Sequence, residues 1–342
     1  MSLLPDTPPQ SIDELHERVS RPSDAVIRLI SQHKGNICIL GAGGKMGFHL
    51  TKMLNRAVSA ANANIEVLAV SRFQSPSSVS LFHSHGLRTY SADLLHEAIP
   101  EEVLECRTVF FLAGVKFGTS NDPQRLYKTN VVLPRRVTEE FRDANIVALS
   151  TGCVYPFVRP DTGGSRETDS ADAPGEYAQS CLGRETVFQD SGVRSCLIRL
   201  NYSVDLQYGV LVDIAVKVQN REPIDLQMGY VNAIWQGDAL NTIVLAIQSC
   251  DRPSAILNLT GPEILSVRDV AQTFGNLMGV PVEFRGCEAP TAWLNHASKA
   301  HQLYGTPTVN SDLLISWIAD WVRNKRPLLG KPTQFEIRNG KY

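Results

Sequence analysis

The stretch Asn36-Ile37-Cys38-Ile39-Leu40-Gly41-Ala42-Gly43-Gly44-Lys45-Met46-Gly47 joins a short apolar run to a glycine-rich segment with glycines at 41, 44 and 47. The apolar run is typical of a buried parallel strand, and apolar residues at helical spacing follow the glycines. A tight turn at this junction requires glycine, and the missing side chains let the backbone approach a pyrophosphate. The N-terminus of the next helix adds free N–H groups and a positive dipole end. The stretch therefore predicts a dinucleotide site, with a purely steric glycine turn as the alternative.

Strands and helices alternate along the chain outward from this stretch. Further strands are expected at 65–70, 87–90, 108–113, 145–150 and 255–259, and one continuous helix is expected at 123–144. Strands separated by helices form parallel βαβ units with right-handed crossovers. The sequence therefore predicts an α/β protein with a Rossmann-type, doubly wound parallel sheet and a smaller C-terminal α/β substrate lobe.

The same pattern suggests how the chain divides. A capping box at Ser11 to Glu14 and the break at Arg21-Pro22 indicate two short helices before the first strand. We expect a helical N-terminal arm at 1–35 and a dinucleotide-binding domain at 36–201, its sheet completed by 236–261. A substrate lobe is expected from 202–235 together with 262–330, and a C-terminal tail at 331–342.

Composition excludes several classes of function. The 342 residues carry 33 basic and 35 acidic side chains, a formal charge of -2, which gives no electrostatic footprint for nucleic acid or for an anionic membrane. The seven cysteines are scattered without a CxxC pair, as is usual in a reducing compartment, and the eight histidines show no metal-ligand spacing. We expect a cytoplasmic protein without a metal and without a transmembrane segment.

The end of the second expected strand bears on the choice of dinucleotide. An NAD-preferring site usually places Asp or Glu there, whereas this chain has Ser71 and Arg72. An arginine can pair with a 2′-phosphate, so the sequence favours NADP over NAD, with a solvated Arg72 as the alternative. The expected contacts of the phosphate loop are Gly41, Gly43, Gly44, Lys45, Met46 and Gly47.

With these motifs in view, the chain resembles the extended short-chain dehydrogenases/reductases, the NAD-dependent epimerase/dehydratase family. The resemblance covers about residues 36 to 325 and rests on the GxxGxxG spacing, on segments near the later strands and on Ser150-Thr151-Gly152-Cys153-Val154-Tyr155. It implies a Rossmann fold, a nicotinamide dinucleotide and a carbohydrate-like substrate. It also implies further cofactor contacts at Asp93, Leu94, Leu112, Ala113, Gly114 and Asn130.

The chain departs from the family at the catalytic centre. The family uses Tyr-x-x-x-Lys, and here Tyr177 is followed by Cys181 in place of the lysine. The resemblance implies that Tyr177 exchanges a proton with the substrate, that Thr151 holds the reacting oxygen and that position 181 lies beside the cofactor. An unperturbed phenol has a pKa of about 10 and is a poor base at neutral pH. Arg184, one turn farther on, is one candidate for the missing cation.

Three interpretations of Tyr177 and Thr151 remain open: an active acid/base pair, a weak or inactive site in a dinucleotide-binding sensor or scaffold, and simple packing residues. The favoured function is an NAD(P)-dependent oxidoreductase or epimerase acting on a carbohydrate or a sugar-derived alcohol or ketone. The non-catalytic sensor is the alternative.

The family's usual arginine for a nucleotide diphosphate is missing before Tyr230, which favours a smaller substrate. We expect a homodimer. The substrate-binding residues that we expect are Lys116, Asn201, Tyr202, Gln207 and Tyr208.

Overall fold

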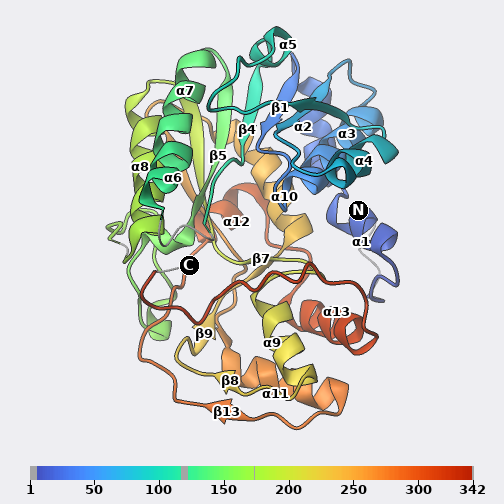
Figure 1. The fold of residues 1–342 in the computed structure, drawn as a ribbon, viewed down its shortest axis with the longest axis vertical. Coiled ribbons are helices and arrows are strands. Elements are labelled where there is room, and N and C mark those ends of the chain that lie inside the picture. The colour runs from blue at the N-terminus through green and yellow to red at the C-terminus, as the bar shows by residue number, and fades with distance from the viewer. Residues whose placement is uncertain (1–5, 117–121, 173, 341–342) are drawn as a thin grey trace.

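The computed structural model describes residues 6–116, 122–172 and 174–340. Its centre is a parallel sheet of seven strands in the order β11-β6-β5-β4-β1-β2-β3 (Figure 1). The strands are β1 (Ile37–Leu40), β2 (Val67–Ser71), β3 (Arg88–Ser91), β4 (Thr108–Phe111), β5 (Asn145–Thr151), β6 (Arg194–Leu200) and β11 (Ala255–Leu259). This sheet confirms the predicted Rossmann-type fold.

The strand order reverses at β1. From there the chain builds β2 and β3 on one side and the remaining strands on the other, so β1 and its neighbour β4 flank a topological switch point. Open α/β sheets bind ligands in the crevice at the carboxyl ends of such strands. The glycine-rich loop that follows Leu40 lies at this crevice.

Both faces of the sheet are buried. Ile37 and Ile39 of β1 pack into one hydrophobic cluster, and the alternate residues Cys38 and Leu40 pack into another. Every residue of β1 is buried and apolar, which is why this strand is a continuous apolar run in the sequence. Helices α2, α3 and α10 cover one face and α6, α7 and α8 the other (Figure 1). Their bounds are α2 (Asp24–Gln32), α3 (Gly47–Ala61), α6 (Pro123–Tyr127), α7 (Leu133–Glu140), α8 (Glu176–Asp190) and α10 (Gln236–Leu245).

The prediction of one continuous α-helix at 123–144 is wrong. A π-helical segment, Lys128–Val132, separates α6 from α7, and the helix ends at Glu140. Pro134 has no N–H to bond the carbonyl of Asn130, so the regular α-helical ladder cannot run through this turn. Asn130 lies inside the π segment and is fully buried. Shorter elements on this half are α4 (Pro76–Ser84), α5 (Glu101–Leu104), and 3-10 turns at Gly152–Val154, Pro160–Thr162 and Ala246–Ser249.

A smaller lobe lies beyond the carboxyl ends of the strands (Figure 1). Three helices pack on one another there, and Trp317 and Trp321 of the last one are fully buried. The apolar stripe of that helix thus serves the core of the chain itself. The elements are α9 (Val210–Gln219), α11 (Val267–Met278), α12 (Ser298–Tyr304) and α13 (Ser311–Arg323), with paired short strands β7 (Ser203–Val204) and β10 (Ile234–Trp235), β8 (Ile224–Asp225) and β13 (Phe284–Arg285), and β9 (Tyr230–Val231) and β12 (Leu265–Ser266).

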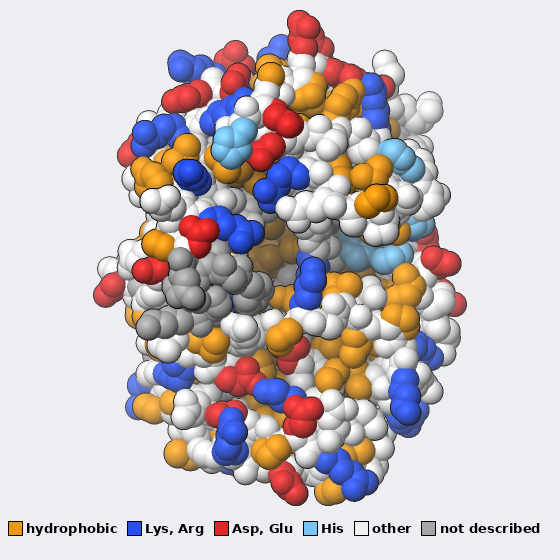
Figure 2. All heavy atoms as spheres, in the orientation of Figure 1, with side chains coloured by type: hydrophobic (Ala, Val, Ile, Leu, Met, Phe, Trp, Pro, Cys, Tyr) orange, Lys and Arg blue, Asp and Glu red, His pale blue; other side chains and the backbone are white. Residues whose placement is uncertain are grey.

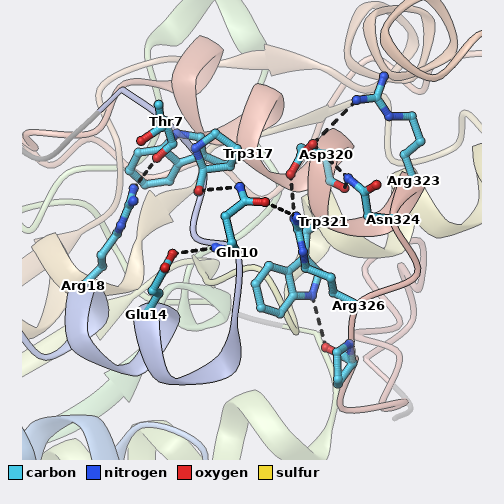
Figure 3. A network of polar contacts seen from close by, with 12 residues as sticks. Thr7, Gln10, Glu14, Arg18, Trp317, Asp320, Trp321, Arg323, Asn324 and Arg326 are labelled. Atoms are coloured by element: carbon cyan, nitrogen blue, oxygen red, sulfur yellow. Dashed lines mark hydrogen bonds and ion pairs between the residues drawn. The ribbon is translucent and has the colours of Figure 1, made fainter.

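The N-terminal arm contacts both halves of the molecule. Helix α1 (Ile12–Val19) packs on α10, while the segment before it reaches α13. The indole of Trp317 donates to the carbonyl of Asp6 at 2.9 Å. Arg326 donates to the Gln10 side chain at 2.5 Å (Figure 3). Arg326 also pairs with Asp320 at 2.5 Å. The arm is thereby fixed at the point where the chain leaves α13.

Residues 327–340 form a C-terminal strap across the front of the molecule between the sheet and the smaller lobe (Figure 1). The strap is held by specific polar contacts: Leu329 donates its N–H to the Gln207 carbonyl, Thr333 donates both its N–H and its hydroxyl to Asp213, and Arg338 donates to Thr291. Sequence reasoning treated 331–342 only as a tail. None of the helices in the described parts of the chain has the length and apolarity needed to cross a bilayer.

Candidate active site

Two adjoining cavities open at the carboxyl ends of β1 and β4. The larger has a volume of about 600 Å³ and the smaller about 280 Å³, and both are lined by Gly41, Gly44 and Leu112. Figure 2 shows the molecule hollowed between its two halves, with Lys and Arg side chains at the rim. The site therefore has two compartments that meet at the glycine loop.

The three glycines of the loop are required for different reasons. Gly41 has φ +88°, and a Cβ there would lie 2.5 Å from the backbone nitrogen of Ala113. A Cβ on Gly47 would lie 2.5 Å from the Cα of Ala42, so this glycine permits the close packing of α3 on the turn. A Cβ on Gly44 would meet only the carbonyl of Gly41, at 3.3 Å. Gly44 thus leaves open space at the start of α3, which has no side-chain cap.

The larger cavity contains most of the residues predicted to bind the dinucleotide. Arg72 lies at its edge after β2, close to Asp93 after β3. Sequence reasoning missed Ser75, Ser78 and Lys331, which also line it, because nothing local marks them as neighbours of the glycine loop. The predicted residues that line this cavity are Gly41, Gly43, Gly44, Ser71, Arg72, Asp93, Leu94, Leu112, Ala113 and Gly114.

The smaller cavity brings together the predicted catalytic residues and most of the predicted substrate contacts. Thr151 from the end of β5 and Tyr177 from the first turn of α8 both line it. Residues that sequence reasoning missed are Ser203, Cys153 and Thr333, the last contributed by the C-terminal strap. The predicted residues that line this cavity are Lys45, Met46, Gly47, Lys116, Thr151, Tyr177, Asn201, Tyr202 and Tyr208.

Three predicted site residues do not line either cavity. Asn130 is buried beneath the site, where its amide bonds both backbone polar groups of Val115 and the hydroxyl of Ser180. Cys181 packs in a small apolar cluster with Val154 and Tyr155. Gln207 lies beside the strap and donates to the carbonyl of Pro327 at 3.4 Å.

Burial dominates the chemistry of Tyr177. It raises the pKa of the phenol well above the ordinary value, and the nearby thiols of Cys181 and Cys153 raise it further, whereas Arg184 lowers it. The guanidinium of Arg184 is directed toward the sheet, donating to the carbonyl of Leu149 at 2.7 Å and to Asn130 at 2.6 Å. Arg184 thus holds the floor of the site and does not line the cavity that contains Tyr177.

A buried polar network supports the strand that carries Thr151. The preceding residue, Ser150, donates to Glu185 of α8 at 2.5 Å, and Glu185 pairs with Arg199 of β6 at 2.6 Å. The side chains of this ion pair are 3% and 6% exposed. Arg199 also donates to the Tyr155 hydroxyl at 2.6 Å. This network fixes β5 and β6 to α8 and so sets the separation between Thr151 and Tyr177.

Lys45 links the glycine loop to the smaller lobe. Its ammonium lies 4.0 Å from the centroid of the Tyr208 ring and 3.9 Å from a carboxylate oxygen of Asp205, and it donates to the carbonyl of Ser203 at 3.4 Å. Burial lowers the pKa of Lys45, and Asp205 and Asp213 oppose this effect. The lysine therefore contributes a largely compensated charge to the smaller cavity.

The residues of the two cavities fit a dinucleotide. The open space at Gly44 provides a cradle that a Cβ would narrow, and the hydroxyl of Ser203 and the Nε of Arg184 are buried without a hydrogen-bond partner in the described parts of the chain. Buried polar atoms of this kind are expected where a ligand or water completes the bonding. Within the described residues, no cluster of three or more His, Cys, Asp or Glu side chains is arranged to hold a metal ion.

Comparisons with known proteins agree with this geometry. The model of the NAD dependent epimerase/dehydratase family matches residues 37–185, which span β1 to α8. This part of the chain is therefore similar to that family. No curated protein matches the sequence significantly.

Solved structures show the same fold over most of the chain. A complex of MoeE5 with UDP-glucuronic acid and NAD is 19% identical, has a TM-score of 0.68, and covers 85% of this chain and 100% of its own. The UDP-glucuronic acid 4-epimerase from Bacillus cereus is 16% identical with a TM-score of 0.69, covering 85% and 99%. The dTDP-glucose 4,6-dehydratase from Bacillus anthracis is 13% identical with a TM-score of 0.70, covering 85% and 97%. The chain therefore shares its fold with these three structures.

Proposed function

We propose that this protein is an NAD(P)-dependent oxidoreductase or epimerase that acts on a small carbohydrate or on a sugar-derived alcohol or ketone. The observation that carries the proposal is the joining of the two cavities at Gly41, Gly44 and Leu112. A dinucleotide in the larger cavity would extend toward Thr151 and Tyr177 in the smaller one. The solved relatives bound to NAD and sugar nucleotides support this assignment.

In the oxidative direction, the ionised Tyr177 would take the O–H proton of a substrate hydroxyl as that hydroxyl becomes a carbonyl. A nicotinamide dinucleotide held at the glycine loop would supply the acceptor for the hydride lost from the substrate C–H bond. Thr151 is buried at the end of β5 and lines the smaller cavity, and in this proposal its hydroxyl holds the reacting oxygen. In the reductive direction Tyr177 returns the proton to the carbonyl oxygen, which suits a phenol whose pKa is raised.

The dimensions of the site favour a small substrate. The smaller cavity measures about 280 Å³, below the range of roughly 300–1,000 Å³ that is usual for drug-sized ligands. Thr333 of the C-terminal strap lines this cavity and is fixed by two hydrogen bonds to Asp213. The substrate that we propose is therefore of monosaccharide size and lacks a nucleotide.

For the cofactor we propose a preference for NADP. Arg72, Lys331, Ser75 and Ser78 line the larger cavity, so cationic and hydroxyl donors surround the end of β2. Charged donors of this kind hold a phosphate by charge-assisted hydrogen bonds. Asp93 also lines the cavity and would bond a ribose hydroxyl equally well, so NAD binding remains part of the proposal.

The experiment has two stages. Fluorescence titration with NAD⁺ and NADP⁺ tests for the dinucleotide site, and a panel of aldoses, sugar acids and keto sugars is then screened for a change in nicotinamide absorbance or for an epimerised product. Tyr177→Phe should abolish turnover while cofactor binding persists. Tyr127→Phe is the matched control, because Tyr127 is exposed on α6.

A non-catalytic dinucleotide sensor is the second candidate, and the observation that favours it is the raised pKa of Tyr177 beside two thiols. The sensor predicts saturable cofactor binding with no turnover and no difference between wild type and Tyr177→Phe. Light scattering of the purified chain tests the proposed homodimer separately.

A further inference from the structure

The phenol of Tyr177 needs a nearby cation if it is to act as a base. Its pKa is raised by burial and by the thiols of Cys181 and Cys153. A phenolate inside a small cavity is stabilised chiefly by an opposite charge within about 4–6 Å. The structure must therefore supply positive charge close to this ring if proton transfer is to occur near neutral pH.

Helix α8 does not bring that charge into the cavity. Position 181, one turn after Tyr177, is a cysteine whose side chain is 1% exposed. Arg184, on the following turn, donates to the Leu149 carbonyl and to Asn130 beneath the site. Its field reaches Tyr177, but its hydrogen-bonding groups are directed to the backbone of β5 and to the π segment.

Lys116 approaches the same ring from a different element. It follows β4 by five residues, and its ammonium nitrogen lies 5.6 Å from the centroid of the Tyr177 ring. Both side chains line the smaller cavity together with Thr151. Burial lowers the pKa of Lys116, and the thiols of Cys153 and Cys181 oppose that effect.

The second lysine of the cavity does not have this relation to Tyr177. Lys45 lies over the ring of Tyr208 and within 3.9 Å of Asp205, so a carboxylate already balances much of its charge. In the described parts of the chain, the charged and titratable groups near Tyr177 include Cys181 and Arg184 on α8, Cys153 after β5 and Lys116 after β4. Lys45, Tyr202 and Tyr208 line other parts of the same cavity.

We propose that Lys116 is the cation that stabilises the ionised Tyr177, so that the charge enters the site from the segment after β4 and not from α8. Lys116 is then a positioning residue that acts through Tyr177. This inference rests on the proposed function, since a phenolate matters only if Tyr177 transfers a proton. It also differs from the sequence-based expectation that Lys116 contacts the substrate.

The test measures the ionisation of Tyr177 directly and requires no substrate. Difluorotyrosine, whose phenol is more acidic than that of tyrosine, is incorporated at position 177, and its ¹⁹F resonance is followed against pH with and without NAD⁺. Removing the cation in Lys116→Met should raise the apparent pKa of this phenol by about one to three units. Lys116→Arg, which keeps the charge, should leave the apparent pKa of the phenol close to its value in the protein with Lys116.

Lys34→Met is the matched control, because it removes one exposed lysine at the amino end of β1, the opposite edge of the sheet. It should leave the resonance unchanged. An unaltered apparent pKa in Lys116→Met would overturn the proposal, and circular dichroism checks that each variant is folded. If Lys116→Met does not fold, Lys116→Gln and Lys116→Arg provide the same comparison between a neutral and a charged side chain.

Turnover separates this inference from the proposed function. If the wild type reacts with no member of the sugar panel, the proposed function fails, whatever the resonance shows. If it does react, Lys116→Met should move the acidic limb of the kcat/KM profile for oxidation to higher pH. A rise in KM with an unmoved limb would show instead that Lys116 holds the substrate.

Discussion

Replacing Gly47 by alanine should destabilise the whole fold, whereas the same change at Gly44 should affect only ligand binding. The Cβ added at position 47 would lie 2.5 Å from the Cα of Ala42 and still closer to the carbonyl oxygen of Ala42, whereas ordinary contact begins at 3.4 Å. The backbone must therefore move by at least about 0.9 Å at that point. Neither side of this contact is a flexible side chain, so the first turn of α3 must shift away from the turn that contains Ala42.

The cost follows from the size of this overlap. Overpacking a tight site costs about 1–3 kcal/mol, and a clash between two backbone segments belongs at the upper end, about 3 kcal/mol. That is a large share of a total stability of about 5–15 kcal/mol. At Gly44 the added Cβ meets only the Gly41 carbonyl at 3.3 Å, and its φ is not in the left-handed region. Gly44→Ala should therefore change the free energy of unfolding by less than about 1 kcal/mol.

Urea denaturation followed by circular dichroism measures both variants. Gly47→Ala should lower the midpoint with an unchanged m-value, and Gly44→Ala should leave the midpoint near that of the wild type. In NAD⁺ and NADP⁺ titrations both variants should bind more weakly, because a methyl group at position 44 narrows the cradle. Equal midpoints for the two variants would refute the packing argument, and unchanged cofactor affinity in Gly44→Ala would refute the placement of the pyrophosphate.

Three other predictions use the same measurements. Glu185→Gln leaves Arg199 buried without its carboxylate and should lower the free energy of unfolding by about 3 kcal/mol in urea denaturation. His49 and His16 share a buried hydrogen bond of 2.8 Å, and burial lowers the pKa of both, so the native state stays neutral where the unfolded chain takes up protons. The contribution of the two neutral histidines to the free energy of unfolding should be fully present above about pH 6.5 and should fall as the pH drops below that value. His49→Asn should weaken this pH dependence. Arg72→Ala should reduce the ratio of NADP⁺ to NAD⁺ affinity by about tenfold or more in fluorescence titrations.

Each of these changes has a control with the same chemistry elsewhere. Glu140→Gln removes a carboxylate whose nearest arginine nitrogen is 3.9 Å away on the surface and should cost less than about 0.5 kcal/mol. His96→Gln alters an exposed histidine, and Arg88→Ala removes an exposed arginine on β3. The argument for Glu185 fails if Glu140→Gln is as destabilising as Glu185→Gln. The argument for His49 fails if His96→Gln changes the pH dependence of stability as much as His49→Asn does. The argument for Arg72 fails if Arg88→Ala changes the cofactor preference as much as Arg72→Ala does.

The sequence predicts the features whose causes are local. The glycine loop is recognisable because a turn that enters a helix beside a phosphate needs glycine within a span of seven residues. The central strands β1 and β2 are recognisable because both of their faces are buried, which makes them largely apolar. The break at residues 128–132 was missed even though Pro134 marks it, because apolar periodicity continues through a π turn.

The remaining parts of the site depend on contacts between distant segments. Tyr177 and Lys116 are 61 positions apart, and Thr333 reaches Asp213 across 120 positions. No local sequence pattern predicts such long-range contacts, because loops and chain ends are positioned by the elements on which they pack. Arg184 illustrates the converse. Its helical spacing from Tyr177 suggested a catalytic cation, whereas the carbonyl of Leu149 and the amide of Asn130 hold its guanidinium beneath the site.

The cysteine at position 181 and the lysine at position 116 are mutually compatible, because each favours the residue type found at the other position. Cys181 is buried beside Val154 and Tyr155, in surroundings that suit a thiol and would desolvate an ammonium group. The field of the Cys181 side chain reaches Lys116, so a cation at position 181 would also repel the Lys116 ammonium. When Lys116 supplies the positive charge, a lysine at position 181 of α8 is therefore unfavourable. A cysteine at position 181 is then compatible with a working tyrosine, because a phenolate responds to the position of a charge and not to the element that carries it.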